Sequence, residues 1–174
     1  MKAYLRNAGE SDMDLLFQWV NDKEVRNNSF RTKDITYEEH QNWFMDILKR
    51  EDVKQYIYML KEKPVGQIRI CLTEEEAEIS YSIAPKHRCM GYGKQMIADL
   101  KKKVQEEYPK VKRLVAQVKP ENVASQKAFL DCGYYEESKK FVLNLEMAEK
   151  DGIMPSDFSS EENAGSVSES LEFS

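Results

Sequence analysis

One short segment has residue types suited to binding phosphate. Residues 83–94 lie between an alternating run and an amphipathic run, and they contain the pattern Arg88-x-x-Gly91-x-Gly93. Glycines allow a tight turn and a close approach of a ligand to the backbone. The free N–H groups at the start of a following helix attract an anion, and Lys94 would add a positive charge. The segment is therefore predicted to hold a diphosphate, while a plain glycine turn is the alternative.

Two other phosphate-binding patterns do not fit this segment. A Walker loop has a longer spacing between its glycines and ends in Gly-Lys-Ser or Gly-Lys-Thr, which is absent here. A dinucleotide-binding fingerprint reads GxGxxG after the first strand, with an acidic residue about 20 positions later. The segment matches neither that position nor that spacing.

A second motif follows about one helix and one strand later. It reads Asn122-x-x-Ser125-x-x-x-Phe129-x-x-x-Gly133-Tyr134, and Asn122 is also suited to capping a helix. Each motif is weak by itself, but the two together resemble the GNAT superfamily of N-acetyltransferases. The resemblance covers roughly residues 3–146 in the order of elements.

The resemblance implies acetyl-CoA as the acyl donor and no metal. Backbone amides of the loop would hold the pyrophosphate, and the pantetheine would lie along the preceding strand. The acetyl group would pass directly to an amine, with positioning of both substrates as the main source of acceleration. The coenzyme-binding residues would be Ile83, Arg88, Cys89, Met90, Gly91, Tyr92, Gly93, Lys94, Asn122, Ser125 and Phe129.

An amine must attack as its free base, so a general base or a water relay is expected. Glu78 is the candidate, because it lies on the strand beside the presumed thioester. Glu75 and Glu76, at the edge of that strand, are the weaker alternatives. An ordinary solvated glutamate would fit the same position.

The leaving thiolate raises the question of a proton donor. Many family members have a tyrosine seven residues after the motif asparagine, where this sequence has Phe129. Tyr81 is the candidate in its place, with Tyr134, Tyr135, a water molecule or unassisted departure as alternatives. Cys89 is interpreted as a spectator, because the reaction needs no nucleophilic thiol.

The first half of the chain should carry acceptor specificity. Residues 19–30 and 38–44 resemble those of bacterial acetyltransferases that act on nucleotide-linked 4-amino-4,6-dideoxy sugars, including enzymes of the pseudaminic acid type. Arg26, His40 and Trp43 could contact a diphosphate and a ring. The alternatives are core packing for Trp43, which is the more common role of such a residue, a backbone hydrogen bond for His40 and a surface ion pair for Arg26. Enzymes that acetylate ribosomal-protein N-termini share part of this pattern, and a non-catalytic CoA-binding module is the other alternative.

The periodicity of the chain predicts the order β-α-α-β-β-β-α-β-α-β, a mixed α/β fold with helices packed on a largely antiparallel sheet. Ser11 with Asp14 and Thr36 with Glu39 have the spacing of capping boxes. A later helix has the core stripe Met96, Ile97, Leu100 and Val104. The predicted strands cover 4–6, 55–60, 65–72, 77–83, 111–118 and one or two within 134–145, and the last helix covers 123–132.

Composition sets the remaining limits. The 174 residues carry 26 Lys and Arg against 31 Asp and Glu, a net charge of −5 that argues against a dedicated nucleic-acid binder. Six of the acids fall in residues 151–174, which predicts a domain over 1–150 and an acidic, Ser-rich extension. Three scattered cysteines and the lack of a signal peptide or long apolar run predict a cytoplasmic protein without disulfide, zinc or membrane segment. Monomer and homodimer both stay open.

Overall fold

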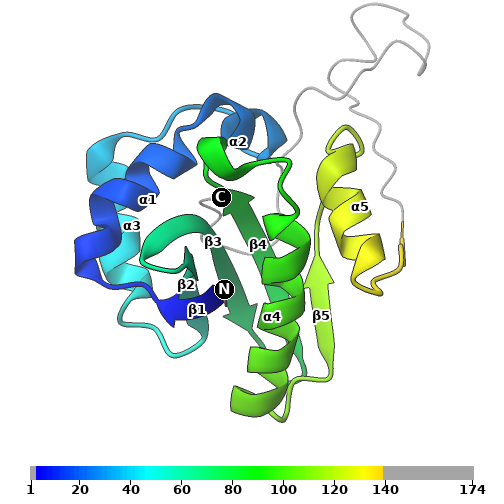
Figure 1. Ribbon diagram of the computed structural model, residues 1–174. Helices are drawn as coiled ribbons and strands as arrows, with labels where there is room; N and C mark the ends of the chain where they lie inside the picture. Colours follow the sequence, from blue (N-terminus) through cyan, green and yellow to red (C-terminus); the bar gives the residue numbers. More distant parts are fainter. Residues whose placement is uncertain (1–2, 139–174) are drawn as a thin grey trace, which may run out of the picture.

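The computed structural model describes residues 3–138 and has a five-stranded sheet at its centre (Figure 1). The strands lie in the sheet in chain order. The first three pairings are antiparallel and the last, between β4 and β5, is parallel. The strands are β1 (Ala3–Asn7), β2 (Val53–Leu60), β3 (Lys63–Leu72), β4 (Glu76–Ile83) and β5 (Arg113–Ala116).

Helices cover both faces of this sheet, which confirms the predicted mixed α/β class. The helices are α1 (Met13–Val20), α2 (Lys23–Asn28), α3 (Tyr37–Ile47), α4 (Tyr92–Glu107) and α5 (Val123–Asp131). Short 3₁₀ turns precede α1 (Glu10–Asp12) and α4 (Pro85–His87). Helices α1 and α3 pack on one face, whereas α4 crosses the other face with α5 beside it (Figure 1).

Two apolar clusters hold these layers together. Under α4 lie Met96, Ile97, Leu100 and Val104, all buried as the sequence predicted. Alternate residues of the strands point the opposite way and meet α1 and α3 in the second cluster, whose buried members are Leu16, Trp19, Trp43, Phe44, Ile47, Val53, Ile57, Met59 and Ala84. Because side chains alternate across a strand, each face of the sheet supplies one of the clusters.

The first half differs from the prediction at two helix starts. Ser11 does not cap α1; a 3₁₀ turn intervenes, and the carboxylate of Asp12 instead accepts hydrogen bonds from the Gly9 N–H (2.9 Å) and from Arg6 (2.7 Å at each oxygen). Helix α2 was not predicted, because five of its six residues are polar and the remaining one, Val25, gives no apolar period. It begins where Asp22 caps the N–H groups of Glu24 and Val25, both at 3.2 Å.

The first four predicted strands are each extended by one or two residues at one or both ends, and other predictions hold or shorten. Thr36 and Glu39 form the predicted capping box, with the Thr36 N–H donating to Glu39 at 2.7 Å and the Glu39 N–H donating to the Thr36 hydroxyl at 3.2 Å. The strand predicted over 111–118 is limited to the four residues of β5. Residues 134–138 are not a strand. The rest of the predicted closing strands and the boundary at 150 lie outside the described residues.

The parallel pairing of β4 with β5 is short, and this opens the sheet. It runs from Glu76 opposite Arg113 to Ile79 opposite Ala116, and there it stops. Strand β4 continues for four more residues, 80–83, which keep their partners on β3 but have none on β5. Backbone groups on that side of β4 are therefore available to a ligand.

Candidate active site

The loop that follows β4 has the backbone shape of an anion site. Cys89 and Gly91 both have left-handed backbones, with φ of 59° and 79°. Alternation of left-handed and ordinary residues turns successive N–H groups toward one point. Helix α4 starts directly afterwards with no side-chain cap and no acidic residue in its first turn, so the first N–H groups, including those of Tyr92, Gly93 and Lys94, have no intrahelical acceptors. The loop thus combines aimed donors with the positive end of a helix.

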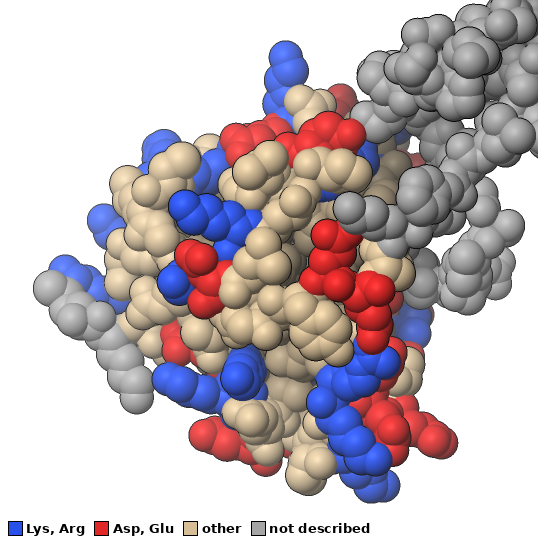
Figure 2. Space-filling model, turned by 90° about the vertical axis from the view of Figure 1, so that its right-hand side faces the viewer, with Lys and Arg blue, Asp and Glu red and all other residues tan. Residues whose placement is uncertain are grey.

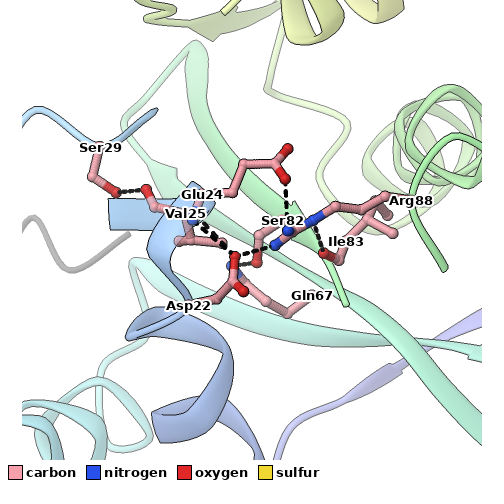
Figure 3. A network of polar contacts seen from close by, with 8 residues as sticks. All are labelled: Asp22, Glu24, Val25, Ser29, Gln67, Ser82, Ile83 and Arg88. Atoms are coloured by element: carbon pink, nitrogen blue, oxygen red, sulfur yellow. Dashed lines mark hydrogen bonds and ion pairs between the residues drawn. The ribbon is translucent and has the colours of Figure 1, made fainter. Parts of the chain in front are cut away.

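The two basic side chains of the motif, Arg88 and Lys94, form ion pairs with other elements. The ammonium group of Lys94 lies 3.3 Å from a carboxylate oxygen of Asp131 on α5. Arg88 turns toward α2, where its guanidinium forms ion pairs with Asp22 and with Glu24, the latter at 2.7 Å (Figure 3). Its Nε also donates to the carbonyl of Ile83 at the end of β4, at 3.1 Å. With both side chains in ion pairs, the groups of this motif that remain for an anion are the backbone N–H groups.

The second motif forms the other wall. Asn122 caps α5 as predicted, its side-chain oxygen accepting the Ser125 N–H at 3.1 Å. Phe129 is buried, with its ring centroid 5.6 Å from that of Tyr81 and 5.0 Å from that of Tyr134. The position that lacks a tyrosine is thus flanked by two tyrosine rings, one from β4 and one from the segment after α5.

Both flanking hydroxyls remain protonated at neutral pH. Burial raises the pKa of Tyr81, and a hydrogen bond with Ser125 opposes that rise only in part. Burial raises the pKa of Tyr134 as well, and its hydroxyl is buried without a hydrogen-bond partner among the described residues. Either group has the protonation state of a proton donor. Tyr135, the third candidate, is exposed.

The opposite face of the same strands carries a polar track. Gln67 donates to the hydroxyl of Ser82 at 3.0 Å (Figure 3). Gln55 in turn donates to Gln67 at 2.6 Å, which links β2, β3 and β4 in one row. One step along, Arg69 lies opposite Ser80 in the register, and the Ser80 hydroxyl is buried without a partner in the described part of the chain. This row continues the side of β4 on which Glu78 lies.

A cavity of about 270 Å³ opens at the end of this row. It lies over β2 to β5, next to the C-terminal end of α3, and Glu78 is in its wall. Both signs of charge line it. The charged residues are Arg50, Asp52, Arg69, Glu76 and Glu78.

The residues predicted to contact the acceptor are all buried in this structure. His40 is only 1% exposed, among the rings of Phe17, Trp43 and Phe44 at 5.6–5.9 Å. Burial lowers the pKa of His40, so the imidazole is neutral at pH 7, and neither ring nitrogen has a hydrogen-bond partner among the described residues. Trp43 is 6% exposed, and the guanidinium carbon of Arg69 lies 5.4 Å from its ring centroid.

Arg26 is 4% exposed and organises the chain that follows α2. One terminal nitrogen donates to the carbonyls of Arg31 (3.2 Å) and Lys33 (3.3 Å), and the other donates to Ser29 (3.2 Å). Arg26, His40 and Trp43 therefore present almost no surface to a ligand in this conformation. Of the three, Trp43 reaches the cavity indirectly, through its contact with Arg69.

Sequence reasoning missed Arg50, Asp52 and Arg69 in the cavity wall and Asp22 and Glu24 beside Arg88. A signal for Arg69 was present, since polar residues alternate with apolar ones on β3 and on β4 and so give the two strands a common polar face. No comparable signal marks the pairing of Arg88 with Asp22, which are 66 positions apart.

Charge on the side of β5 and α5 is mixed. Figure 2 shows Lys and Arg interspersed with Asp and Glu around a largely uncharged centre on this face. A broad basic surface, of the kind that neutralises nucleic-acid phosphates, is not seen there. Among residues 3–138, no helix combines the length and the apolar character needed to cross a bilayer. Nor does this part of the chain bring three or more His, Cys, Asp or Glu side chains together as a metal site.

The sequence matches the family model of the acetyltransferase (GNAT) domain over residues 2–135. Because this match spans most of the chain, the protein belongs to the GNAT acetyltransferase family. No significantly similar sequence was found among curated proteins.

Solved structures with a similar fold include acetyltransferases. The aminoglycoside acetyltransferase AAC(6')-Ib in complex with coenzyme A gives a TM-score of 0.69 at 18% identity, covering 78% of this chain and 86% of that chain. A spermidine N-acetyltransferase from Vibrio cholerae, in complex with CoA and spermine, gives 0.71 at 16% identity, covering 82% and 88%. A domain from Methanocaldococcus jannaschii gives 0.71 at 22% identity, covering 80% and 92%. At these identities the likeness establishes the fold.

Family membership and the site agree with each other. The uncapped start of α4, the left-handed backbones of Cys89 and Gly91 and the open edge of β4 fit the diphosphate and the amide-bearing arm of CoA. The protein is an N-acetyltransferase that uses acetyl-CoA, as the resemblance of its two motifs implied.

Proposed function

We propose that the protein acetylates the 4-amino group of a UDP-linked 4-amino-4,6-dideoxy sugar, with the sugar ring bound in the cavity next to Glu78. The observation that carries this proposal is the mixed lining of that cavity, in which Arg50 and Arg69 accompany Asp52, Glu76 and Glu78. A nucleotide sugar bears an amine on its ring and negative charge on its diphosphate. Carboxylates suit the former and arginines suit the latter.

The neighbouring structures name acceptors of a different charge. Aminoglycosides and polyamines carry only positive charges, so a site for them should be lined by carboxylates. Arg69 lies in the cavity wall, where most of its side chain is buried and its guanidinium packs against Trp43. A fixed positive charge in that position disfavours a polycation by repulsion. In this proposal Trp43, His40 and Arg26 stabilise the acceptor side of the protein without contacting the acceptor.

We assign the general base to Glu78, on the acceptor face of β4. It would take the proton from the amine as the amine attacks. The thioester of acetyl-CoA supplies the activated acetyl group when the coenzyme is bound. Main-chain N–H groups on the open edge of β4, near Tyr81 and Ile83, would stabilise the developing negative charge on the carbonyl oxygen.

We assign the proton donor for the leaving thiol to Tyr81. Glu78 and Tyr81 are three residues apart on one strand, so their side chains leave opposite faces of the sheet. The base thus faces the acceptor cavity, while the donor faces α4 and α5, which form the coenzyme side. Tyr134 is the alternative donor, because its buried hydroxyl lies beside Phe129.

A protein N-terminal acetyltransferase is the second candidate function. Its peptide substrate would need an open groove, and basic N-termini would suit the acidic part of the cavity wall. A module that binds CoA without catalysis is the third, motivated by Phe129 at the position where many relatives have a tyrosine.

Product detection by mass spectrometry distinguishes these candidates. The full chain is incubated with acetyl-CoA and, separately, with a UDP-4-amino-4,6-dideoxy sugar, basic N-terminal peptides, spermidine and an aminoglycoside. We expect the mass increase of one acetyl group on the sugar only. An increase on peptides, polyamine or aminoglycoside alone would overturn the sugar assignment, and no increase on any amine despite CoA binding would favour a non-catalytic module.

A matched pair of variants tests the cavity. Arg69→Gln should raise KM for the sugar nucleotide, whereas Lys54→Gln, on the neighbouring strand and outside the cavity wall, should leave it unchanged. Equal KM values for the two variants would place the acceptor elsewhere.

A further inference from the structure

Past Ile79 and Ala116, strands β4 and β5 no longer pair, and we call the space between their unpaired ends the cleft. Helix α2 contacts residues on both sides of it. The register of these parallel strands pairs Ile79 with Ala116, an offset of 37 positions. Continued along the chain, this offset brings Ser82 level with Lys119, which lies three residues past the end of β5. Helix α2 touches both sides of the cleft at this level, as its hydrogen bonds to Arg88 and Lys119 show.

On the β4 side, α2 is attached through Arg88. The guanidinium pairs with Asp22 and Glu24 at the start of the helix and holds the Ile83 carbonyl at 3.1 Å (Figure 3). The side chains of Arg88 and Asp22 are each only 20% exposed. An ion pair at this depth is screened by salt less than one on the open surface.

On the β5 side, α2 is attached through Lys119. The ammonium group of Lys119 donates to the carbonyl of Asn27, near the end of the helix, at 3.2 Å. The backbone of Lys119 is itself fixed, since its carbonyl accepts hydrogen bonds from the Asn122 N–H and the Gln126 side chain, both at 3.0 Å. The two attachment points are therefore connected to the pyrophosphate loop and to the cap of α5.

Helix α2 is itself held rigidly. The buried guanidinium of Arg26 donates to two carbonyls in the following segment and to Ser29, and Ser29 in turn donates to the Val25 carbonyl at 2.7 Å. A short helix tied down in this way can transmit a constraint from one side of the cleft to the other.

We propose that α2 is a bridge that sets the width of the coenzyme cleft, with Asp22 and Arg88 as positioning residues on one side and Lys119 on the other. Arg88 then serves the coenzyme by holding the loop through α2, and its guanidinium does not bind the pyrophosphate. The inference concerns coenzyme binding alone, so it does not depend on which amine is the acceptor.

A direct role for Arg88 in binding the pyrophosphate predicts the opposite effect on CoA affinity. If the guanidinium moved to the pyrophosphate on binding, Asp22 would compete with the coenzyme for it. Removing the charge of Asp22 would then free Arg88 and tighten CoA binding. If α2 instead acts as a bridge, the same substitution loosens the loop and weakens CoA binding. Asp22→Asn separates the two roles well, because asparagine still caps α2.

The experiment is calorimetric titration of the full chain with CoA and with acetyl-CoA. We expect Asp22→Asn and Arg88→Gln each to weaken binding about 5- to 20-fold, within the range of ordinary coupling between sites. The double variant should be no weaker than the worse single one, because both remove the same interaction. Lys119→Met should weaken binding about threefold, in keeping with one exposed hydrogen bond. Asp14→Asn on α1, whose carboxylate accepts from Tyr37, is the matched control and should not change CoA affinity.

Two further readouts exclude a general loss of structure. Asp22→Glu keeps the charge, so its CoA affinity should stay within about twofold of that of the original protein. In the acetylation assay, Asp22→Asn should raise KM for acetyl-CoA while kcat at saturating acetyl-CoA is retained. Unchanged or tighter CoA binding by Asp22→Asn would overturn the proposal, as would additive losses in the double variant or an original protein that does not bind CoA. A protein that binds CoA but does not acetylate the sugar would contradict only the proposed function.

Discussion

The ring of Tyr81 lies directly against Gly93, the second glycine of the segment 88–94 that we propose holds the pyrophosphate, here called the phosphate loop. A Cβ placed on Gly93 would come within 3.3 Å of the ring and 3.6 Å of the hydroxyl of Tyr81. The movement of the ring is restricted, because it also packs edge-to-face with the buried Phe129. The glycine is therefore required for packing, in addition to any contact with a ligand.

Gly93→Ala should consequently destabilise the protein by about 1–3 kcal/mol, the usual cost of overpacking. It should also weaken CoA binding, since the displaced ring adjoins the open edge of β4. Gly9→Ala, where an added Cβ meets nothing within 4 Å, is the control and should change the free energy of unfolding by less than about 0.5 kcal/mol. Denaturant unfolding measures both, and equal stability of the two variants would contradict the close contact.

Substitutions at Gly91 and Cys89 should have opposite effects on stability, because both residues have left-handed backbones. Gly91→Ala should cost about 1–2 kcal/mol and reduce CoA affinity as the N–H groups lose their aim. Cys89→Gly should gain about 0.5–1 kcal/mol by relieving the same strain. Thermal unfolding measures whether Gly91→Ala is destabilised and Cys89→Gly is stabilised, as expected. Retained acetylation by Cys89→Gly would also confirm that the thiol is a spectator, whereas loss of turnover with intact CoA binding would give it a role.

The sequence predicted most of the fold because most elements have a clear period. Four buried residues of α4 and the alternation of β3 and β4 are visible in the amino-acid pattern itself. Helix α2, with five polar residues out of six, has no such period, and it depends on its cap at Asp22 and on long-range contacts. Ser11 has the right spacing for a cap, but Asp12 is drawn to Arg6, so the chain turns differently there.

Only the part of the site that lies within one continuous segment of the chain could be predicted from the sequence. The phosphate loop is one continuous segment, so its glycines and its position before a helix are evident in the sequence. The pairing of Arg88 with Asp22 joins residues 66 positions apart and leaves no local trace. Arg26, His40 and Trp43 show the converse case: polar and aromatic types suit a binding pocket, but the same types also fill a core, and here they are buried.

We expect Glu78→Gln and Glu76→Gln to differ sharply in their effect on kcat. Glu78→Gln should lower kcat about 10²- to 10⁴-fold, the range for loss of a general base, with CoA affinity unchanged. Glu76, at the edge of the cavity, pairs with Arg113 at 2.9 Å, so Glu76→Gln should have little effect on kcat. Steady-state kinetics at saturating substrates decides between them. Full activity of Glu78→Gln would assign the proton to a water relay or to another acid.

The ion pair of Asp12 with Arg6 should make the stability of the fold depend on acid pH. Its two hydrogen bonds lower the pKa of Asp12 below the usual value of 3.8, although burial of the carboxyl opposes this. A lowered folded-state pKa gives stability that is present above about pH 4 and lost as the pH falls through the folded value. Asp12→Asn should therefore cost about 1.5–3 kcal/mol at pH 7, as for a charged hydrogen bond.

The cost of Asp12→Asn should shrink as the pH is lowered below about 4, because the original protein then loses the same interaction. Urea unfolding at several pH values measures this. Asp52→Asn removes a pair with Arg50 that is largely exposed, and it should cost less than about 1 kcal/mol at pH 7. A cost for Asp12→Asn that stays constant down to pH 2 would show that lost packing, and not the charge, is responsible.

Tyr81 and Tyr134 can be separated as proton donors by removing one hydroxyl at a time. Both rings pack against Phe129, so Tyr81→Phe and Tyr134→Phe keep the apolar contacts and remove only the O–H. If Tyr81 donates to the leaving thiol, Tyr81→Phe should lower kcat about 10²-fold with little change in CoA affinity. Ser125→Ala removes the hydrogen-bond partner of Tyr81 but leaves its hydroxyl in place, so its kcat should fall less. Full activity of Tyr81→Phe with a loss in Tyr134→Phe would assign the role to Tyr134, and full activity of both would mean that the thiolate departs unassisted.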